Sequence, residues 1–173
     1  MDLKNYIRTI PDFPKQGIMF RDITTLIGNA EGLKLALDQF IEIAKNTEFD
    51  AVAGLESRGF IFGTPIAYAL NKPFIPIRKK GKLPHNTIEV SYDLEYGSST
   101  LEMHADAVKP GQKILVIDDL IATGGSAKAC AQLIEKLGGE VAKFLFVIEL
   151  IDLKGRDALS SYDVETLTVF EGE

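Results

Sequence analysis

Four short apolar runs, spaced so that a helix fits between neighbouring runs, constrain the fold of this chain more than any other feature. The runs are DAVAGL, PFIPI, KILVI and AKFLFVIEL, at residues 50–55, 73–77, 113–117 and 142–150. Short runs that are apolar on both faces are typical of parallel strands, because helices cover both sides of a parallel sheet. The alternation therefore predicts an α/β protein with a central, largely parallel sheet flanked by helices.

Two of the intervening segments have the periodicity of amphipathic helices, since apolar side chains recur at intervals of three and four. The two stripes consist of Leu33, Leu37, Phe40, Ile41 and Ala44, and of Cys130, Leu133, Ile134 and Leu137. Gly138 and Gly139 would end the second helix. Because the single cysteine lies on an apolar stripe, we expect it to be buried and assign it no chemistry.

Residues 87–104 break this pattern, because polar and apolar side chains alternate there. The apolar face of the first strand would consist of Ile88, Val90, Tyr92 and Leu94. The sequence YGSS, at residues 96–99, supplies a turn, and the alternation resumes at Leu101. A two-stranded ribbon is only marginally stable by itself, so we expect this hairpin to project from the sheet and to move as a lid.

Charge and hydrophobicity limit the class of protein. With 25 acidic and 19 basic residues the net charge is -6, which disfavours binding to nucleic acid or to an anionic membrane. The first residues lack an apolar core of signal-peptide length, and no stretch reaches the roughly 18 apolar residues of a membrane span. We therefore expect a cytoplasmic protein, and the length of the chain predicts a single domain over residues 1–173.

The sequence VIDDLIATGGS, at residues 116–126, combines acidic and anion-binding groups. Asp118 and Asp119 fall at the carboxyl end of a predicted strand, where ligands bind in open α/β sheets. The glycine pair lets backbone N–H groups approach an anion, the two hydroxyls add donors, and the next helix contributes the positive end of its dipole. Carboxylates beside such a cradle suit a ligand that also carries hydroxyl groups or a divalent cation, such as a sugar phosphate.

Residue types alone leave a purely structural interpretation open, in which the aspartates cap the strand and the glycines serve a tight turn. The familiar nucleotide motifs GxxxxGK[ST] and GxGxxG do not fit any strand end of the sequence, so P-loop and dinucleotide sites lose their main support. The whole string, however, resembles the 5-phosphoribosyl 1-diphosphate (PRPP) binding motif of the type I phosphoribosyltransferase family. The resemblance implies that Asp118 and Asp119 accept hydrogen bonds from the ribose hydroxyls. It also implies that the 5-phosphate is wrapped by Ala122, Thr123, Gly124, Gly125 and Ser126.

Four further segments are similar to the members of this family that act on adenine, in the same order along nearly the whole chain. They are PDFPKQGIMFRDIT, GLESRGFIFG, RKKGKLP and SYDLEYG, which begin at residues 11, 54, 78 and 91. The reaction implied is adenine plus PRPP giving AMP and diphosphate, a step of purine salvage. Residues 1–30 would then form a small N-terminal segment that binds the base, called the hood below, and residues 78–105 the flexible lid.

The resemblance also assigns roles within the hood. The ring of Phe20 would stack on the purine, and the backbone around Met19 and Arg21 would read its edge. Taken alone, an aromatic residue packs in a core more often than it binds a ligand, so that alternative stays open.

The segment ESRG follows a predicted strand, and an arginine there could bind phosphate oxygens with two parallel hydrogen bonds. The resemblance places the leaving diphosphate at Glu56, Ser57, Arg58 and Gly59, with further contacts from Arg78 and Lys82. Without the resemblance, a loop arginine or a run of lysines is more often solvated surface.

Glu95 and Tyr96 are similar to the lid residues that close over the reaction centre in this family. Glu95 is the candidate general acid/base, because transfer of a carboxyl group from water into a closed site favours its protonated form. On residue type alone, it would be an exposed glutamate without a role.

The resemblance further implies a requirement for Mg²⁺ and a homodimer. As a hard cation, Mg²⁺ would bind diphosphate and ribose oxygens and keep several waters, so we predict no dedicated protein ligands. Three alternatives stay open: a phosphoribosyltransferase for xanthine or hypoxanthine, a PRPP-sensing regulator, and a binding module without turnover. The acidic balance of the chain, with a pI near 5.0, disfavours a DNA-binding regulator.

Overall fold

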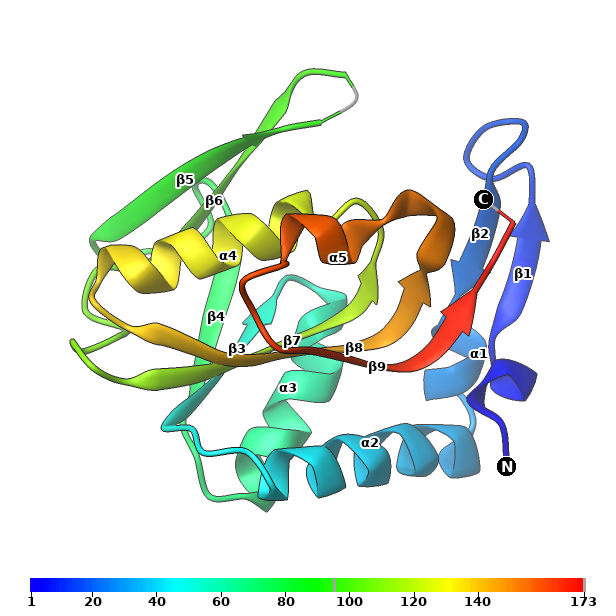
Figure 1. Ribbon diagram of the computed structural model, residues 1–173, viewed down its shortest axis with the longest axis horizontal. Coiled ribbons are helices and arrows are strands. Elements are labelled where there is room, and N and C mark those ends of the chain that lie inside the picture. Colours follow the sequence, from blue (N-terminus) through cyan, green and yellow to red (C-terminus); the bar gives the residue numbers. More distant parts are fainter. Residues whose placement is uncertain (95, 173) are drawn as a thin grey trace.

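The structure is a computed structural model and describes residues 1–94 and 96–172. Its centre is a seven-stranded sheet in the order β5-β6-β4-β3-β7-β8-β9 (Figure 1). The strands are β3 (Ala51–Leu55), β4 (Phe74–Lys79), β5 (Thr87–Asp93), β6 (Ser98–His104), β7 (Lys113–Ile121), β8 (Glu140–Leu150) and β9 (Val164–Phe170). The neighbouring strands β4, β3, β7, β8 and β9 are parallel, and β6 and β5 add an antiparallel edge. The predicted α/β class with a largely parallel sheet is confirmed.

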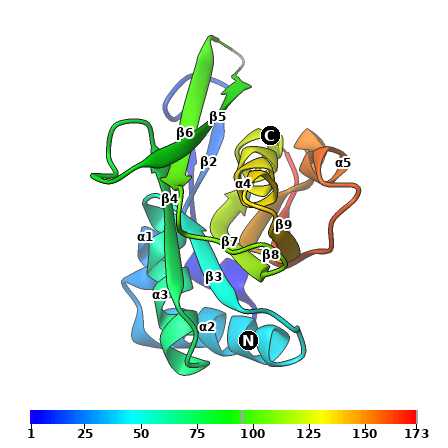
Figure 2. The same cartoon turned by 90° about the vertical axis from the view of Figure 1, so that its left-hand side faces the viewer.

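Helices cover both faces of the sheet. Helices α2 (Ala30–Lys45) and α3 (Arg58–Ala69) pack on one face, and α4 (Gly125–Lys136) packs on the other (Figure 2). Of the two predicted apolar stripes, Phe40, Ala44, Cys130, Leu133 and Ile134 are buried and the other four residues are partly buried. Each large apolar side chain that is fully buried contributes about 2 kcal/mol. The shorter helices are η1 (Leu3–Tyr6), α1 (Thr24–Ile27), η2 (Ile151–Leu153) and α5 (Gly155–Ala158). Within the described ranges, no helix is both long and apolar enough to cross a membrane.

Strand β7 is longer than the sequence indicated. The apolar run ends at Ile117, but pairing with β8 continues to Ile121, so both aspartates belong to the strand. Successive side chains of a strand alternate between faces, but at this last part of β7 both aspartates line one cavity, which is described below. Strand β9 was not predicted, since VETLTVF contains three threonine or glutamate side chains between its apolar ones and lies at the sheet edge.

The predicted hairpin is confirmed. Strands β5 and β6 pair in antiparallel register from Thr87 opposite His104 to Asp93 opposite Ser98. The base of the hairpin is packed into the core, where Leu101 is buried, while its outer part projects beyond the body of the protein (Figure 1).

The hood contains a separate antiparallel pair, β1 (Arg8–Pro11) and β2 (Met19–Asp22), next to the end of β9 (Figure 1). Asp22 fastens this pair to α1, since its carboxylate accepts hydrogen bonds from the Thr24 hydroxyl at 2.6 Å and from Arg8 at 2.5 Å. These hydrogen bonds lower the pKa of Asp22 to about 2. One charged side chain therefore joins both hood strands to the helix that follows.

Candidate active site

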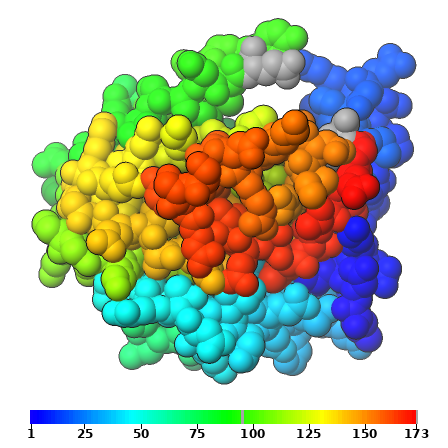
Figure 3. All heavy atoms as spheres, viewed as in Figure 1, coloured from blue at the N-terminus to red at the C-terminus, as the bar shows by residue number. Residues whose placement is uncertain are grey.

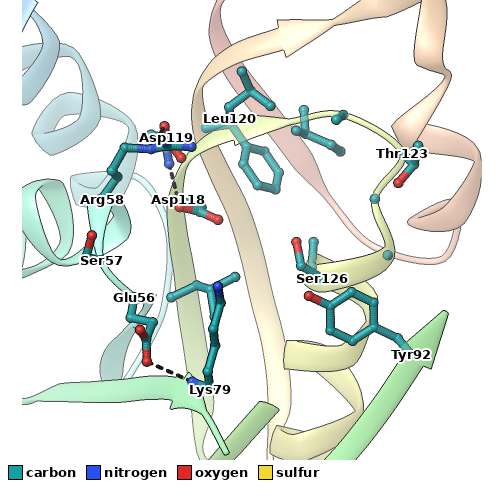
Figure 4. A pocket seen from close by; sticks show the side chains of 17 residues that line it. Glu56, Ser57, Arg58, Lys79, Tyr92, Asp118, Asp119, Leu120, Thr123 and Ser126 are labelled. Atoms are coloured by element: carbon teal, nitrogen blue, oxygen red, sulfur yellow. Dashed lines mark hydrogen bonds and ion pairs between the residues drawn. The ribbon is translucent and has the colours of Figure 1, made fainter. Parts of the chain in front are cut away.

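A cavity of about 430 Å³ opens at the carboxyl edge of the parallel strands (Figure 4). It lies between the start of α3, the end of β7 and the loop that leads into α4. The predicted site residues that line it are Glu56, Ser57, Arg58, Asp118, Asp119, Ala122, Thr123, Gly124, Gly125 and Ser126. Two segments about sixty residues apart meet here, because adjacent parallel strands end at the same edge of a sheet.

The two aspartates are held close together, with Asp118 half-buried and Asp119 buried. Asp119 is 5% exposed, and its Oδ2 lies 2.5 Å from Nε of Arg58. The backbone N–H of Asp119 donates to Oδ1 of Asp118 over 2.8 Å. Burial raises the pKa of Asp118 well above its ordinary value, and the charge of Asp119 raises it further. A ligand with hydroxyl donors or a cation would offset this burial of negative charge.

The loop after β7, residues 122–126, has the features of an anion site. Gly124 has a φ of 84°, and a β-carbon there would lie 2.6 Å from the carbonyl oxygen of Gly155, so the position requires glycine. Gly125 is the first residue of α4, whose first turn leaves backbone N–H groups available at the cavity. The hydroxyls of Thr123 and Ser126 also line this wall. Loop and helix end together suit a phosphate.

Gly59 brings the start of α3 against β7. A β-carbon at this position would lie 2.8 Å from the carbonyl oxygen of Ile117 and 3.2 Å from Oδ1 of Asp118. Glycine therefore allows the close approach that sets Arg58 beside the aspartate pair. The structure gives Gly59 this packing position, and its predicted contact with diphosphate stays a prediction.

Glu56 lies at the end of β3 and contacts the cationic run of the lid. Its carboxylate accepts hydrogen bonds from the Lys79 amide at 2.8 Å, Arg78 Nε at 3.2 Å and Lys82 Nζ at 2.8 Å. Burial by itself would raise the pKa of Glu56, but the hydrogen bonds from Lys82 and the Lys79 amide outweigh burial and lower the pKa. Glu56 therefore holds the base of the lid and its cations in place.

A second cavity, of about 330 Å³, lies under the hood. It is lined by Ile10, Phe13, Phe20, Arg21, Asp22, Ile23, Thr24 and Arg58. The rings of Phe13 and Phe20 meet edge to face, with centroids 5.1 Å apart. Arg58 lines both cavities, so the pocket of the hood adjoins the aspartate site.

Of the other two predicted hood residues, Arg21 lines this second cavity, whereas Met19 is not part of its described lining. The guanidinium of Arg21 donates to Thr9 Oγ1 at 2.7 Å and to the Glu171 carbonyl at 2.9 Å, so its side chain is engaged with β1 and the C-terminal segment. Met19 pairs with Pro11 at the start of β2. Because the Arg21 side chain is engaged elsewhere, its proposed contact with a base would come from its backbone.

The tip of the lid approaches the loop between β1 and β2, and Figure 3 shows the two segments leaning toward each other. Tyr96 is 77% exposed, and Nζ of Lys15 lies 5.0 Å from the centroid of its ring. This cation–π contact joins lid and hood above the cavities. The predicted general acid/base, Glu95, lies outside the described residues.

Comparison with known proteins agrees with this geometry. The profile of the phosphoribosyl transferase domain matches residues 27–171. The chain belongs to the phosphoribosyltransferase family. It is 60% identical to the adenine phosphoribosyltransferase of Agathobacter rectalis over an alignment of 171 residues. This alignment covers 99% of this chain and 98% of the relative.

Two solved structures have the same fold as this phosphoribosyltransferase. The adenine phosphoribosyltransferase of Thermoanaerobacter pseudethanolicus superposes with a TM-score of 0.94 at 46% identity, over 97% of this chain and 98% of the other. The adenine phosphoribosyltransferase of Saccharomyces cerevisiae, complexed with adenine and D-2,5-dideoxy-2,5-imino-altritol 1,6-bisphosphate, superposes with a TM-score of 0.90 at 39% identity, over 96% of each chain. The family resemblance and the fold are thus confirmed.

Two side chains with polar groups that line the first cavity of this phosphoribosyltransferase, Lys79 and Tyr92, were not predicted as site residues (Figure 4). Within the described part of the chain, the wall includes Lys79 but neither Arg78 nor Lys82, which the sequence favoured. The signal for Lys79 was available, because alternation along β4 places it on the same face as the buried Ile77. Tyr92 belongs to the predicted apolar face of the hairpin, but nothing in the sequence placed it over the loop at residues 122–126.

Proposed function

We propose that this phosphoribosyltransferase transfers the phosphoribosyl group of PRPP to adenine, with AMP and diphosphate as products. The observation that carries the proposal is the pair of cavities that meet at Arg58. One has a carboxylate pair and a glycine loop suited to a sugar phosphate, and the other has aromatic walls suited to a flat base. The name of the 60% identical relative supports adenine as that base.

Asp118 and Asp119 would accept hydrogen bonds from the ribose hydroxyls. The backbone and hydroxyls of Ala122, Thr123, Gly124, Gly125 and Ser126 would hold the 5-phosphate. The salt bridge between Arg58 and Asp119 partly neutralises the pair in the absence of substrate. Binding at both ends of the sugar would fix the anomeric carbon between the two cavities.

The leaving diphosphate would be bound by Arg58 together with the backbone of Ser57 and Gly59. Arg78 and Lys82, held by Glu56, would approach when the lid closes, and we add Lys79 because it lines the cavity. Cations placed around the diphosphate stabilise the negative charge that develops as its bond to the anomeric carbon breaks. Glu56 would then act by orienting these cations.

The Phe20 ring would stack on adenine and direct a ring nitrogen to the face of the anomeric carbon opposite the diphosphate. The carbon acquires oxocarbenium character as the diphosphate leaves, the new carbon–nitrogen bond forms, and the nitrogen loses its proton. We propose that Glu95 exchanges that proton and that Tyr96 helps the lid to exclude water from the activated sugar.

We propose that Mg²⁺ enters with PRPP. As a hard cation it would bind the diphosphate and ribose oxygens, and the crowded carboxylates of Asp118 and Asp119, with the raised pKa of Asp118, support a requirement for positive charge beside them. Mg²⁺ would supply charge neutralisation at the diphosphate when it is bound.

We further propose a cytoplasmic homodimer in purine salvage. Two apolar side chains seven residues apart on α3, Ile61 at 36% and Tyr68 at 89% exposure, support an interface on that face of the helix, and sedimentation of the purified protein tests this association.

The test of this function is to supply adenine, hypoxanthine, guanine and xanthine separately with PRPP and Mg²⁺ and to measure nucleotide formation. We expect AMP to form far faster than the other three nucleotides. Faster use of hypoxanthine or xanthine would reject adenine as the substrate. Binding of PRPP without consumption of any base would reject catalysis and favour a PRPP-sensing regulator.

A further inference from the structure

The segment that follows β8 packs against the back of the loop at residues 122–126. A β-carbon on Gly155 would lie 2.4 Å from the carbonyl oxygen of Ala122 and 2.7 Å from Cγ1 of Ile121. In the opposite direction, a β-carbon on Gly124 would lie 2.6 Å from the carbonyl oxygen of Gly155. The two backbones are therefore in direct contact, and the position of Gly155 limits where the loop can lie.

Arg156, next in the chain, attaches this segment to the sheet. Its Nε donates to both carboxylate oxygens of Glu149, at 2.9 and 3.0 Å. Its two other nitrogens donate to the Val164 carbonyl at 2.9 Å and to Thr166 Oγ1 at 3.3 Å. The Thr166 hydroxyl also donates to Glu149 at 3.1 Å, which completes a network across β8, β9 and α5.

Glu149 is 6% exposed, so its charge depends on these partners. Removing one partner of a buried ion pair leaves an uncompensated charge, whereas a lysine in place of arginine keeps the charge but loses the planar fork. Arg156 makes four hydrogen bonds in three directions, and a single ammonium group on a flexible stem does not reproduce that geometry. The orientation of the segment should therefore depend on arginine specifically.

We propose that Glu149 and Arg156 are positioning residues for phosphate binding, which act through Gly155 on the loop at residues 122–126. This inference rests on the proposed function, in which that loop holds the 5-phosphate of PRPP. The pair does not touch the cavity; it fixes the wall behind it. Its loss should weaken binding of the sugar phosphate without changing the binding of diphosphate.

The same two strands provide a matched control at their other end. Lys143, at the start of β8, forms ion pairs with Glu165 and with Asp163, the latter at 3.4 Å. Its side chain is 15% exposed, similar to the 8% of the Glu149 side chain. Because this pair lies at the opposite edge of the sheet from the loop, its loss should affect stability alone.

The experiment measures dissociation constants of the purified full-length protein for ribose 5-phosphate, PRPP with Mg²⁺, and diphosphate with Mg²⁺. For Arg156→Lys we expect binding of ribose 5-phosphate and PRPP to weaken about tenfold, because small displacements of binding groups have effects of this size or larger. The affinity for diphosphate should stay within about twofold. For Lys143→Met we expect a lower Tm with all three affinities unchanged.

Two further variants separate positioning from folding. Gly155→Ala places a methyl group against Ala122 directly, and its effect on ribose 5-phosphate binding should be less than additive with Arg156→Lys, since both act through the same contact. If Arg156→Lys fails to fold, Thr166→Val removes only the hydroxyl of the network, and we expect ribose 5-phosphate to bind about threefold more weakly.

Three results would overturn the inference or the function beneath it. Equal losses of affinity for diphosphate and ribose 5-phosphate would show a general structural effect. Unchanged ribose 5-phosphate binding in a folded Arg156 or Thr166 variant would show that the network has no effect on the loop. Either result rejects positioning. If the unmodified protein binds neither ribose 5-phosphate nor PRPP, the proposed function itself fails.

Discussion

Gly124 and Gly97 have the same backbone angle, a φ of 84°, in opposite surroundings. A β-carbon on Gly124 would lie 2.6 Å from Gly155, whereas one on Gly97, in the lid, would meet no atom of the described residues within 4 Å. The site that is proposed to hold the sugar phosphate is therefore built by close packing on the sheet. The base of the lid also packs on the core, but its outer part is held mainly by pairing between its own strands, and we expect that part to move more easily.

The sharpest test of this difference is a pair of identical substitutions. Gly124→Ala should lower the free energy of unfolding by about 3 kcal/mol, because the left-handed angle and the clash with Gly155 both oppose a side chain. Gly97→Ala should cost only about 1 kcal/mol, for the angle alone. Urea unfolding measures both values. Equal costs would show that close packing does not distinguish the two regions.

Neutralising the aspartate pair tests the chemical role of the packed region. In the double variant Asp118→Asn, Asp119→Asn, we expect PRPP to bind about 100-fold more weakly, since hydrogen bonds from hydroxyls to carboxylates are lost at both positions. The unfolding free energy should not fall, because the pKa of Asp118 is raised and its charge is therefore unfavourable in the folded state. Calorimetry with PRPP and Mg²⁺ measures the affinity, and an unchanged affinity would refute the ribose role.

A substitution in the hood should affect the binding of adenine rather than of PRPP. Phe20→Leu keeps an apolar contact with Phe13 but removes the ring, so we expect the KM for adenine to rise about tenfold, given that base stacking contributes roughly 1–3 kcal/mol. The affinity for PRPP should stay unchanged. Phe13→Leu, at the edge of the same pocket, should have a smaller effect on KM. If Phe20→Leu weakens PRPP binding as much as adenine binding, the two cavities do not have separate roles.

The smallest expected effect concerns the attachment of the hood. Because the pKa of Asp22 is lowered to about 2 from 3.8, its contribution to stability is complete above the higher value and is lost as the pH falls through this interval. Asp22→Asn should lower the Tm at pH 7 by about 3 °C, since the partner Arg8 is largely exposed. The difference from the unmodified protein should shrink from pH 4 toward pH 2. A difference that is constant over this range would exclude the charge of Asp22 as its cause.

The elements that the sequence predicted have either a continuous apolar run or apolar side chains that repeat with a regular period. The buried runs at residues 50–55 and 142–150 became β3 and β8, and the stripe in residues 31–46 became α2. Strand β9 was missed because an edge strand with polar side chains has a weaker pattern than a central one. The end of β7 was placed too early, because apolar character stops at Ile117 while backbone pairing with β8 does not.

In the candidate site, too, features carried by a local sequence pattern were predicted and contacts between distant segments were not. The order of residues within VIDDLIATGGS is local, so the carboxylates and the glycine loop could be recognised along the chain. The contact of Glu56 with Lys82 joins residues 26 positions apart, and the contact of Gly155 with Ala122 joins residues 33 positions apart. Such pairs depend on how the sheet is assembled, and no short stretch of sequence contains them.

The sequence alone determined the α/β class, the lid hairpin and the strand–loop–helix that carries the acidic pair, because periodicity and turn chemistry act over a few neighbouring residues. Only the tertiary structure decided that Arg58 stands between two cavities, that Lys79 faces the larger one, and that Glu149 and Arg156 fix the segment behind the loop. These contacts arise from the order in which strands lie side by side, and packing of distant segments sets that order.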